Sequence, residues 1–261
     1  MALPSVSTPK FDLKLPSNGT SVKIRPFLVK EQKLVLHAIE MQDPDQLNNA
    51  LDDVLKDCTF GKVDIDALPV FDVEYLIMQI RARSVGDQVE INYVCNNHVD
   101  DKLLNAEALK YDPEAKEVRG EGVCETRIPL KVNLATLECT SKTERPDNRI
   151  MFTETIGVVM RDLPYGVYKQ LSKEKTNAEV SLKAMAACVE MVINGDEVFT
   201  NSDFTEEELI GWIEELTGDD FDKMDEFIKS MPTMRIEFEM TCPSCGAKEK
   251  VKLEGLDDFL V

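Results

Sequence analysis

Two short cysteine motifs limit the ways in which this chain of 261 residues can fold. Cys242-Pro243-Ser244-Cys245-Gly246 places two thiols on a tight turn, with a glycine where the backbone takes an angle that is awkward for other residues. Far upstream, Cys95 and His98 are separated by the same two-residue gap. Each motif follows a stretch of alternating apolar and polar residues, a pattern typical of a strand. Together the two motifs offer four side chains of the kinds that bind structural zinc.

The alternation in each strand indicates how the motifs meet. Cys95 lies on the same strand face as the apolar residues before it, and the same is true of Cys242. If the two strands lie side by side, both turns open at the same end, and the long segment between them is an insertion of small entropic cost. We therefore expect one Zn²⁺ bound by Cys95, His98, Cys242 and Cys245. Four protein ligands leave no open coordination position, so the ion would be structural and not catalytic.

Other readings of the cysteines stay open at the sequence level. The two turns could hold reduced thiols without a metal, or the Cys242/Cys245 pair could be redox-active. Redox pairs usually lie at a helix N-terminus, whereas this pair follows a strand. Cys124 and Cys139 flank strand-like sequence and are substitute ligands, although neither has a partner two residues away. Cys188 lies in an apolar stretch and is expected to be a core thiol.

Hydrophobic periodicity predicts the remaining elements. A hairpin turns at Asn18-Gly19, a dipeptide that supplies the positive φ angles of a tight turn. Helices are expected at about 30–41, 44–55 and 72–84, strands at about 89–95, 127–134, 155–161 and 236–240, and a second helical group at 164–231. Within that group, Ala178–Ile193 is predicted to be a buried helix, and Thr205 to Glu208 matches a capping box. Residues 105–122 are predicted to be loop or weak helix, and 256–261 a short amphipathic terminus.

These elements predict an α+β fold, with two helical lobes around a small antiparallel β element that a zinc-ribbon-like pair of knuckles staples together. Residues 1–86 would form an N-terminal hairpin and helical lobe. Residues 87–161 would form a β-rich segment with the first knuckle, followed by an acidic helical insertion at 162–231. Residues 232–261 would carry the second knuckle and a tail, and would pack on 87–161.

The net charge of the chain disfavours some classes of binding partner. The chain has 49 acidic and 30 basic residues, a net charge of −19, which repels nucleic-acid phosphates and anionic lipid. No apolar stretch is long enough for a membrane span, and no secretory signal is evident, so we expect reduced thiols in a cytosolic setting. The stretch from Asp203 to Lys229 holds eleven carboxylates against two lysines. It is either a solvated helix face or a docking face for a basic partner.

The motif search predicts that the protein is not an enzyme. The sequence contains no His-Glu-x-x-His and no Gly-x-Ser-x-Gly. Gly61-Lys62 is followed by Val63 and lacks the upstream glycine of a phosphate-binding loop. His37, within a helical pattern, is expected to be a packed or surface histidine.

Three stretches of the chain resemble the T4-like bacteriophage baseplate protein family, whose members include baseplate hub subunits and hub-assembly factors. The first is VKIRPFLVKE at 22–31, which resembles the entry into the first helix of the family. The second is DIDALPVFDVEYL at 64–76, continuing through QIRARSVG at 79–86. The third is Cys242–Gly246 followed by LEGLDDF at 253–259, which resembles the C-terminus of the family. The three stretches occur in the order that the family has.

The resemblance implies a structural or assembly component of a contractile tail baseplate hub, a late viral protein that acts through protein–protein contacts. Its partners would be other hub or tail proteins, the tape-measure protein among them. It would work in the host cytoplasm during assembly and, if retained, in the tail baseplate of the virion. The alternative is a zinc-ribbon module for nucleic acid or another regulatory partner, which rests on the local cluster of Lys248, Lys250 and Lys252.

Overall fold

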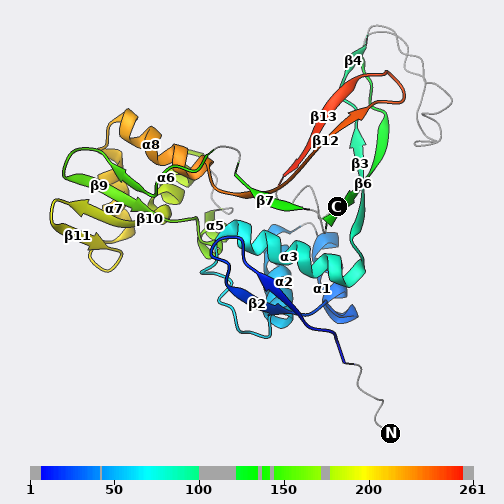
Figure 1. The fold of residues 1–261 in the computed structure, drawn as a ribbon, viewed down its shortest axis with the longest axis horizontal. Coiled ribbons are helices and arrows are strands. Elements are labelled where there is room, and N and C mark those ends of the chain that lie inside the picture. Colours follow the sequence, from blue (N-terminus) through cyan, green and yellow to red (C-terminus); the bar gives the residue numbers. More distant parts are fainter. Residues whose placement is uncertain are drawn as a thin grey trace. The chain divides into compact units, whose positions relative to one another are not determined.

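The computed structural model describes residues 7–41, 43–99, 122–134, 137–141, 144–171 and 177–254. The chain forms two compact units, and each unit is built from two separate segments (Figure 1). Unit 1 contains Met1–Ile80 and Cys139–Thr233, and unit 2 contains Arg81–Glu138 and Met234–Val261. The predictions for residues 105–121 and for 256–261 lie outside the described residues. Seven helices and several small antiparallel sheets are described, which confirms the α+β class.

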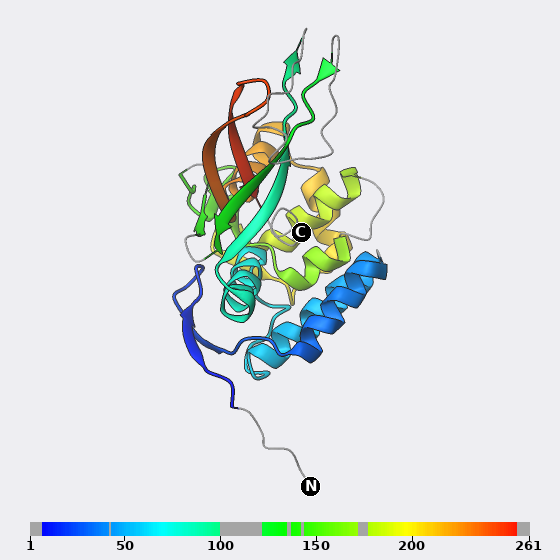
Figure 2. The same ribbon diagram turned by 90° about the vertical axis from the view of Figure 1, so that its right-hand side faces the viewer.

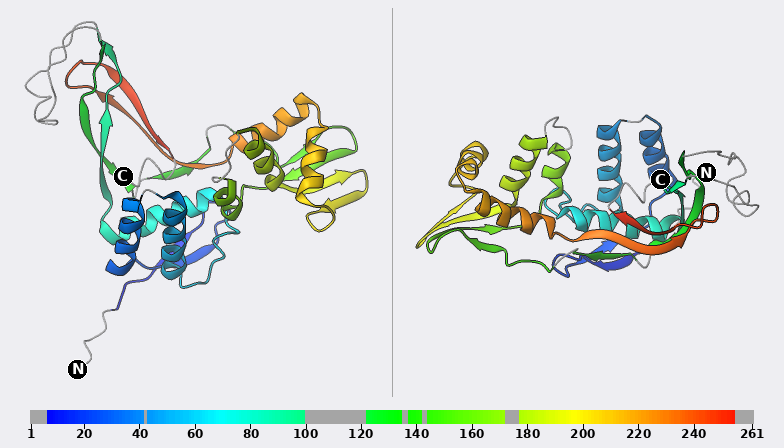
Figure 3. Two further views of the ribbon diagram at one scale, coloured as in Figure 1. Left: turned by 180° about the vertical axis from the view of Figure 1, so that it is seen from behind. Right: turned by 90° about the horizontal axis from the view of Figure 1, so that it is seen from above.

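The first part of unit 1 begins with the predicted hairpin. Strands β1 (Phe11–Lys14) and β2 (Ser21–Ile24) are antiparallel, and Gly19 has a φ of +69° in the turn between them. Helices α1 (Val29–Met41) and α2 (Pro44–Cys58) follow and lie side by side (Figures 2 and 3). The side chain of Asp43 caps α2 by accepting a hydrogen bond from the Asp45 N–H, with proline next in the chain. Helix α3 (Val70–Val85) ends before Gly86, whose φ is +107°.

A buried ion pair ties the hairpin to the start of α1. The guanidinium of Arg25 donates to both carboxylate oxygens of Glu31, at 3.0 and 3.2 Å. Glu31 also accepts the backbone N–H of Leu28, and its side chain is only 5% exposed. Burial acts to raise the pKa of Glu31, but the hydrogen bonds from Arg25, Leu28 and Lys30 outweigh it and lower the pKa from 4.5 to about 2.

The second part of unit 1 is a four-stranded antiparallel sheet with helices on one face (Figure 3). The strand order is β11 (Glu197–Thr200), β10 (Val189–Asn194), β9 (Ile156–Met160) and β8 (Arg149–Met151). The helices of this part are α5 (Tyr165–Leu171), α6 (Asn177–Cys188), α7 (Glu206–Glu214) and α8 (Gly218–Lys229). A shared core includes Val158, Met185, Ile213 and Phe227.

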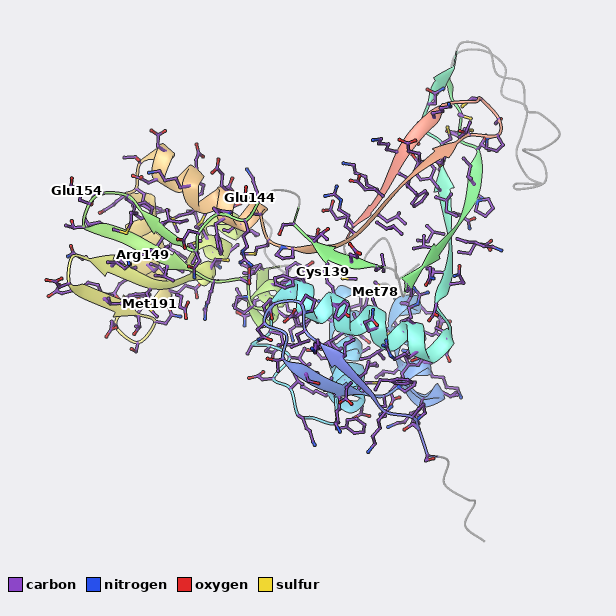
Figure 4. The ribbon with its side chains drawn as sticks, viewed as in Figure 1. Met78, Cys139, Glu144, Arg149, Glu154 and Met191 are labelled. Carbon is purple, nitrogen blue, oxygen red and sulfur yellow. The ribbon has the colours of Figure 1, made fainter. Side chains whose placement is uncertain are left out.

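The pairing within this sheet fixes which side chains form rows across it. Arg149 on β8 and Met191 on β10 are both in register with Val159 of β9, and Figure 4 labels both residues. The predicted capping box at the start of α7 is confirmed, because the Thr205 hydroxyl accepts the Glu208 N–H and the Glu208 carboxylate accepts the Thr205 N–H.

One element prediction in this part is wrong. Ala178–Ile193 was expected to be a single buried helix, but the helix ends at Cys188 and Val189–Asn194 is strand β10. The local sequence explains the change, because three β-branched residues follow Cys188 and an Asn194-Gly195 turn leads into β11. The second helical group is therefore interrupted by two strands of the sheet.

Unit 2 contains two long antiparallel strand pairs, each called a hairpin below, that lie next to each other (Figures 1 and 2). Strand β3 (Gln88–Val94) pairs with β6 (Arg127–Asn133), and β12 (Thr233–Thr241) pairs with β13 (Lys248–Glu254), both antiparallel. A short pair, β4 (His98–Val99) with β5 (Gly122–Val123), continues the first hairpin. The chain passes from unit 2 to unit 1 within strand β7 (Glu138–Thr140), which is a neighbour of β12 in a three-stranded sheet with β13.

Among the described residues, the two cysteine-bearing strands β3 and β12 belong to different sheets and are not hydrogen-bonded neighbours. Strand β3 is paired with β6 and β12 with β13, so each cysteine motif belongs to its own hairpin. A hydrogen bond joins the two hairpins, because the Tyr93 hydroxyl of β3 donates to the Glu249 carboxylate of β13 at 2.7 Å. This bond, together with burial, raises the pKa of the Tyr93 phenol to about 12.

In the part of the chain that the structure describes, no helix combines the length and apolar character needed to cross a membrane.

The Arg25–Glu31 pair predicts an acid-sensitive step in the stability of unit 1. Because the folded-state pKa of Glu31 is depressed, its stabilisation is complete above pH 4.5 and is lost as the pH falls toward 2; the full effect is about 3 kcal/mol. Glu31→Gln should lower the free energy of unfolding by up to that amount at pH 7, and the gap to wild type should shrink at pH 3, as urea unfolding would measure. Glu40→Gln, on an exposed position of α1, is the control and should change stability little. An equal gap at both pH values would contradict this assignment.

The Tyr93–Glu249 bond predicts a smaller, local effect in unit 2. Tyr93→Phe should lower the opening free energy of β3 and β13 by about 1 kcal/mol, since one hydrogen bond between the hairpins is lost. Native-state hydrogen exchange of peptides from these strands measures this. The control is Glu239→Gln, which removes an ion pair with Lys250 whose side chains are 80% and 70% exposed and should have almost no effect. Equal effects of the two substitutions would argue against a link between the hairpins.

Candidate metal centre

Four cysteine thiols converge in unit 2. The Sγ atoms of Cys95, Cys124, Cys242 and Cys245 all lie within 4.8 Å of one another. Cys95, Cys124 and Cys242 are buried, and Cys245 is half-buried. Each hairpin supplies two of these thiols, so the cluster bridges the hairpins at the end where β3 and β12 finish.

The first hairpin positions its two thiols through backbone hydrogen bonds. Beyond the last β3–β6 pair, the Cys95 N–H donates to the Thr126 carbonyl at 3.0 Å, and the Glu125 N–H donates to the Cys95 carbonyl at 2.8 Å. The Cys124 N–H then donates to the Asn97 carbonyl at 2.9 Å. These bonds continue the hairpin past both cysteines as far as the β4–β5 pair.

The second hairpin positions its thiols on the turn between β12 and β13. The Cys242 N–H donates to the Ala247 carbonyl at 2.8 Å, and the Gly246 N–H donates to the Cys242 carbonyl at 2.9 Å. Gly246 has a φ of +72°, a conformation that residues with a Cβ rarely adopt, which explains the glycine of the motif. The turn thus has the shape expected of a zinc knuckle.

The distances between the sulfurs suit a single metal ion. Cys95 Sγ lies 3.7 Å from Cys245 Sγ, and Cys124 Sγ lies 3.7 Å from Cys242 Sγ. Four sulfurs at the Zn–S distance of about 2.3 Å in a tetrahedron are about 3.8 Å apart. A disulfide would need a separation of about 2.05 Å, and all four cysteines are free.

The electrostatics of the thiols differ along the cluster. Burial raises the pKa of Cys95, and burial also raises the pKa of Cys242, against the effect of the N–H groups of Cys245 and Ser244. Burial of Cys124 acts in the same direction, but hydrogen bonds from Thr126 outweigh it and lower the pKa of Cys124 to about 7. Without a cation, burial therefore favours the neutral thiol at Cys95 and Cys242, whereas a bound cation would stabilise the thiolates.

The structure brings together three of the four residues that the sequence predicted as ligands. Cys95, Cys242 and Cys245 belong to the cluster. The backbone of His98 lies in β4 opposite Val123, and its side chain lies outside the described part of the structure. Cys124, which the sequence analysis named as a substitute ligand, lies among the other three thiols.

A prediction of which strands pair would have favoured Cys124 as a ligand. The strand-like stretches at 89–95 and 127–134 are neighbours in the chain, and neighbouring strands usually pair. The observed register places Val94 opposite Arg127, so the residues just beyond the two strand ends must come together. The search for two ligands separated by two residues selected His98 instead, because that search considers only a single continuous turn.

The other three cysteines do not join this cluster. Cys58, Cys139 and Cys188 are free, and Cys139 lies on β7 (Figure 4). Burial raises the pKa of Cys139 and of Cys188 to about 12 and that of Cys58 to about 11. These values are those of inert core thiols.

Two hollows lie in unit 1. One of about 360 Å³ is lined by residues that include Arg161, Lys183 and Glu206, and one of about 290 Å³ is mainly apolar and includes Phe199 and Trp212. Neither lining contains a histidine or a cysteine that would serve as a nucleophile or general base.

Comparison with known proteins identifies a family. The family model described as "T4 bacteriophage base plate protein" matches residues 8–261. No curated protein and no solved structure matches the chain. The match covers the hairpin, the helices and both cysteine-bearing hairpins, and it confirms the family resemblance of the three sequence stretches. The chain therefore belongs to the T4 bacteriophage base plate protein family.

Proposed function

We propose that this protein is a structural or assembly component of the baseplate hub of a contractile phage tail, and that it acts through protein–protein contacts. The observation that carries this proposal is the family match across residues 8–261. Membership implies a structural role in a phage baseplate, not catalysis, and partners among other tail and baseplate proteins. Placement in the hub, as opposed to another part of the baseplate, is the step that we add.

Exposed apolar side chains on α1 support a role in protein contacts. Val29 is 68% exposed, Leu36 52% and Met41 50%, and Leu34 and Ile39 are also exposed. Single exposed apolar residues are ordinary, but a group of them on one helix is typical of a surface that another protein covers. With 3.6 residues per turn, Val29, Leu36 and Ile39 lie on one side of α1, and Leu34 and Met41 lie on another. We propose that the α1 face formed by Val29, Leu36 and Ile39 contacts another baseplate protein.

The nucleic-acid alternative fits the charges poorly. Lys250 and Lys252 on β13 lie opposite Glu239 and Glu237 on β12 and form ion pairs with them at 3.7 and 3.3 Å. Carboxylates beside these lysines reduce the positive potential that would attract phosphates. With a net charge of −19 over the chain, a protein partner is the better proposal.

We further propose that the cysteine cluster binds Zn²⁺ and that the ion is structural. A set of thiolates in tetrahedral arrangement selects zinc or iron–sulfur chemistry over harder cations. Since the thiols come from two hairpins, the ion would fasten one hairpin to the other. It would thereby give unit 2 a fixed shape for contacts with its partners.

The zinc proposal predicts that Cys242→Ser loses the metal and unfolds unit 2. A structural zinc contributes on the order of 10 kcal/mol, so its loss should abolish the protection of β3, β6, β12 and β13 from hydrogen exchange. Elemental analysis should give one zinc per wild-type chain and none in the variant. Cys139→Ser, outside the cluster, is the matched control and should retain the metal. Full protection of the strands in a zinc-free protein would contradict the proposal.

The contact proposal predicts that a charge on the α1 face weakens assembly. In co-expression with hub and tape-measure proteins, the wild-type chain should co-purify with at least one of them, and Leu36→Asp should reduce the yield at least tenfold. A loss of more than about 1.4 kcal/mol of binding free energy would produce that change. Val198→Asp on β11, also at an exposed apolar position, is the control and should co-purify normally.

Failure of the wild-type chain to co-purify with any hub or tail protein would contradict the hub role. Equal loss with both variants would contradict the assignment of the contact to α1. Mass spectrometry of purified virions would then show whether the protein stays in the tail baseplate or acts in the host cytoplasm during assembly.

A further inference from the structure

We infer that Cys124 is the fourth ligand of the metal site, so that Cys95, Cys124, Cys242 and Cys245 bind one Zn²⁺ through four thiolates. This inference rests on the proposed zinc role and specifies its donor set. The first knuckle is then not a continuous turn of Cys95 to His98. It is a split knuckle, in which residues 96–123 are inserted between its two ligands.

The backbone brings Cys124 to the site by a pairing that does not involve the thiols. Three hydrogen bonds link the segment Cys95–Asn97 to the segment Cys124–Thr126, at 2.8, 2.9 and 3.0 Å. They extend the β3–β6 ladder, in which Val94 lies opposite Arg127. The approach of Cys124 to Cys95 therefore follows from strand register, and the side chains need only turn toward the second hairpin.

Cys124 also has a polar partner in its own turn. Its Sγ lies 3.2 Å from the hydroxyl of Thr126, two residues further along the chain. Metal ligands are commonly held in position by such neighbouring polar groups, so this contact supports Cys124 as a ligand.

Two further features indicate that Cys124 is part of a metal-binding turn. Glu125 has a φ of +51°, a strained angle for a residue with a Cβ, and it lies between Cys124 and Thr126, whose hydroxyl contacts the Cys124 sulfur. Strain at this position persists because the surrounding hydrogen bonds hold the turn. In addition, the side-chain amide of Asn97 donates to Cys245 Sγ at 3.6 Å, so a donor from the first hairpin reaches a sulfur of the second.

The four sulfurs leave no coordination position for His98. Structural zinc is four-coordinate, and the two separations of 3.7 Å match the edges of a tetrahedron of sulfurs. The backbone of Asn97 is hydrogen-bonded to Cys124, and the next residue, His98, lies opposite Val123 in the β4–β5 pair. The four ligands are thus all thiolates, and the histidine that the sequence spacing suggested is not needed.

The test compares Cys124→Ser with His98→Ala in the full-length protein. Competition with a zinc chelator should show that Cys124→Ser weakens zinc binding by more than the ~10–100-fold that changes next to a ligand cause. His98→Ala should bind zinc as the wild type does. Cys188→Ser, in the core of unit 1, controls for the loss of a buried thiol and should also bind zinc normally.

A second measurement uses the wild-type protein, so it does not require that any variant folds. Wild-type protein reconstituted with Co²⁺ should give the thiolate-to-cobalt absorption of a four-sulfur tetrahedral site. Absorption of a three-sulfur, one-nitrogen site, or weakened zinc binding in His98→Ala with normal binding in Cys124→Ser, would overturn this inference but leave the zinc proposal intact. Absence of zinc and cobalt binding in the folded wild-type chain would overturn both.

Discussion

Four thiols from two hairpins converge in unit 2, and we propose that the stability of the unit depends on the ion that they bind. A two-stranded hairpin has little stability alone in water, since it buries few apolar side chains. The hairpins β3–β6 and β12–β13 bury mainly one face each, with Val89, Ile91, Val132, Val251 and Leu253 among the buried residues. Side chains provide further links, of which Tyr93–Glu249 is one, but a single hydrogen bond contributes only about 1 kcal/mol. The metal ion that we propose would be held by both hairpins and would supply a much larger stabilisation, and it would account for the burial of Cys95, Cys124 and Cys242 at one point.

Unit 1 is stabilised in a more usual way. Its sheet and helices share a core of apolar side chains, and its helix starts are capped by Asp43, Thr205 and Thr217. The bidentate pair of Arg25 and Glu31 joins the first hairpin to α1. Apolar residues of α1 remain exposed, and the proposed contact with another baseplate protein would cover some of them.

Local signals in the sequence predicted local structure well. Asn18-Gly19, Asp43-Pro44, Gly86 and the Thr205 capping box each specify a conformation within a few residues, and all four predictions are confirmed. The helix predicted for 178–193 was wrong after Cys188, because apolar runs do not distinguish a buried helix from a buried strand. The turn at Asn194-Gly195 was the signal that would have separated the two.

Long-range pairing was the part that the sequence could not specify. The alternation of residues before Cys95 and Cys242 shows which face each strand buries, but not which strand lies beside it. Cys124 comes to the cluster through the β3–β6 register, across an insertion in its knuckle, and no spacing pattern reveals it. By contrast, the Cys242/Cys245 turn was evident because both thiols and the glycine at φ +72° lie within five residues.

X-ray absorption at the zinc edge of the purified, metal-replete chain tests the central claim most directly, because it counts the atoms bound to the ion. The account predicts four sulfur neighbours at about 2.3 Å and no nitrogen or oxygen in the first shell. A nitrogen neighbour at about 2.0 Å would contradict the four-thiolate clamp, and a purified, folded chain that takes up no zinc would contradict the metal centre itself.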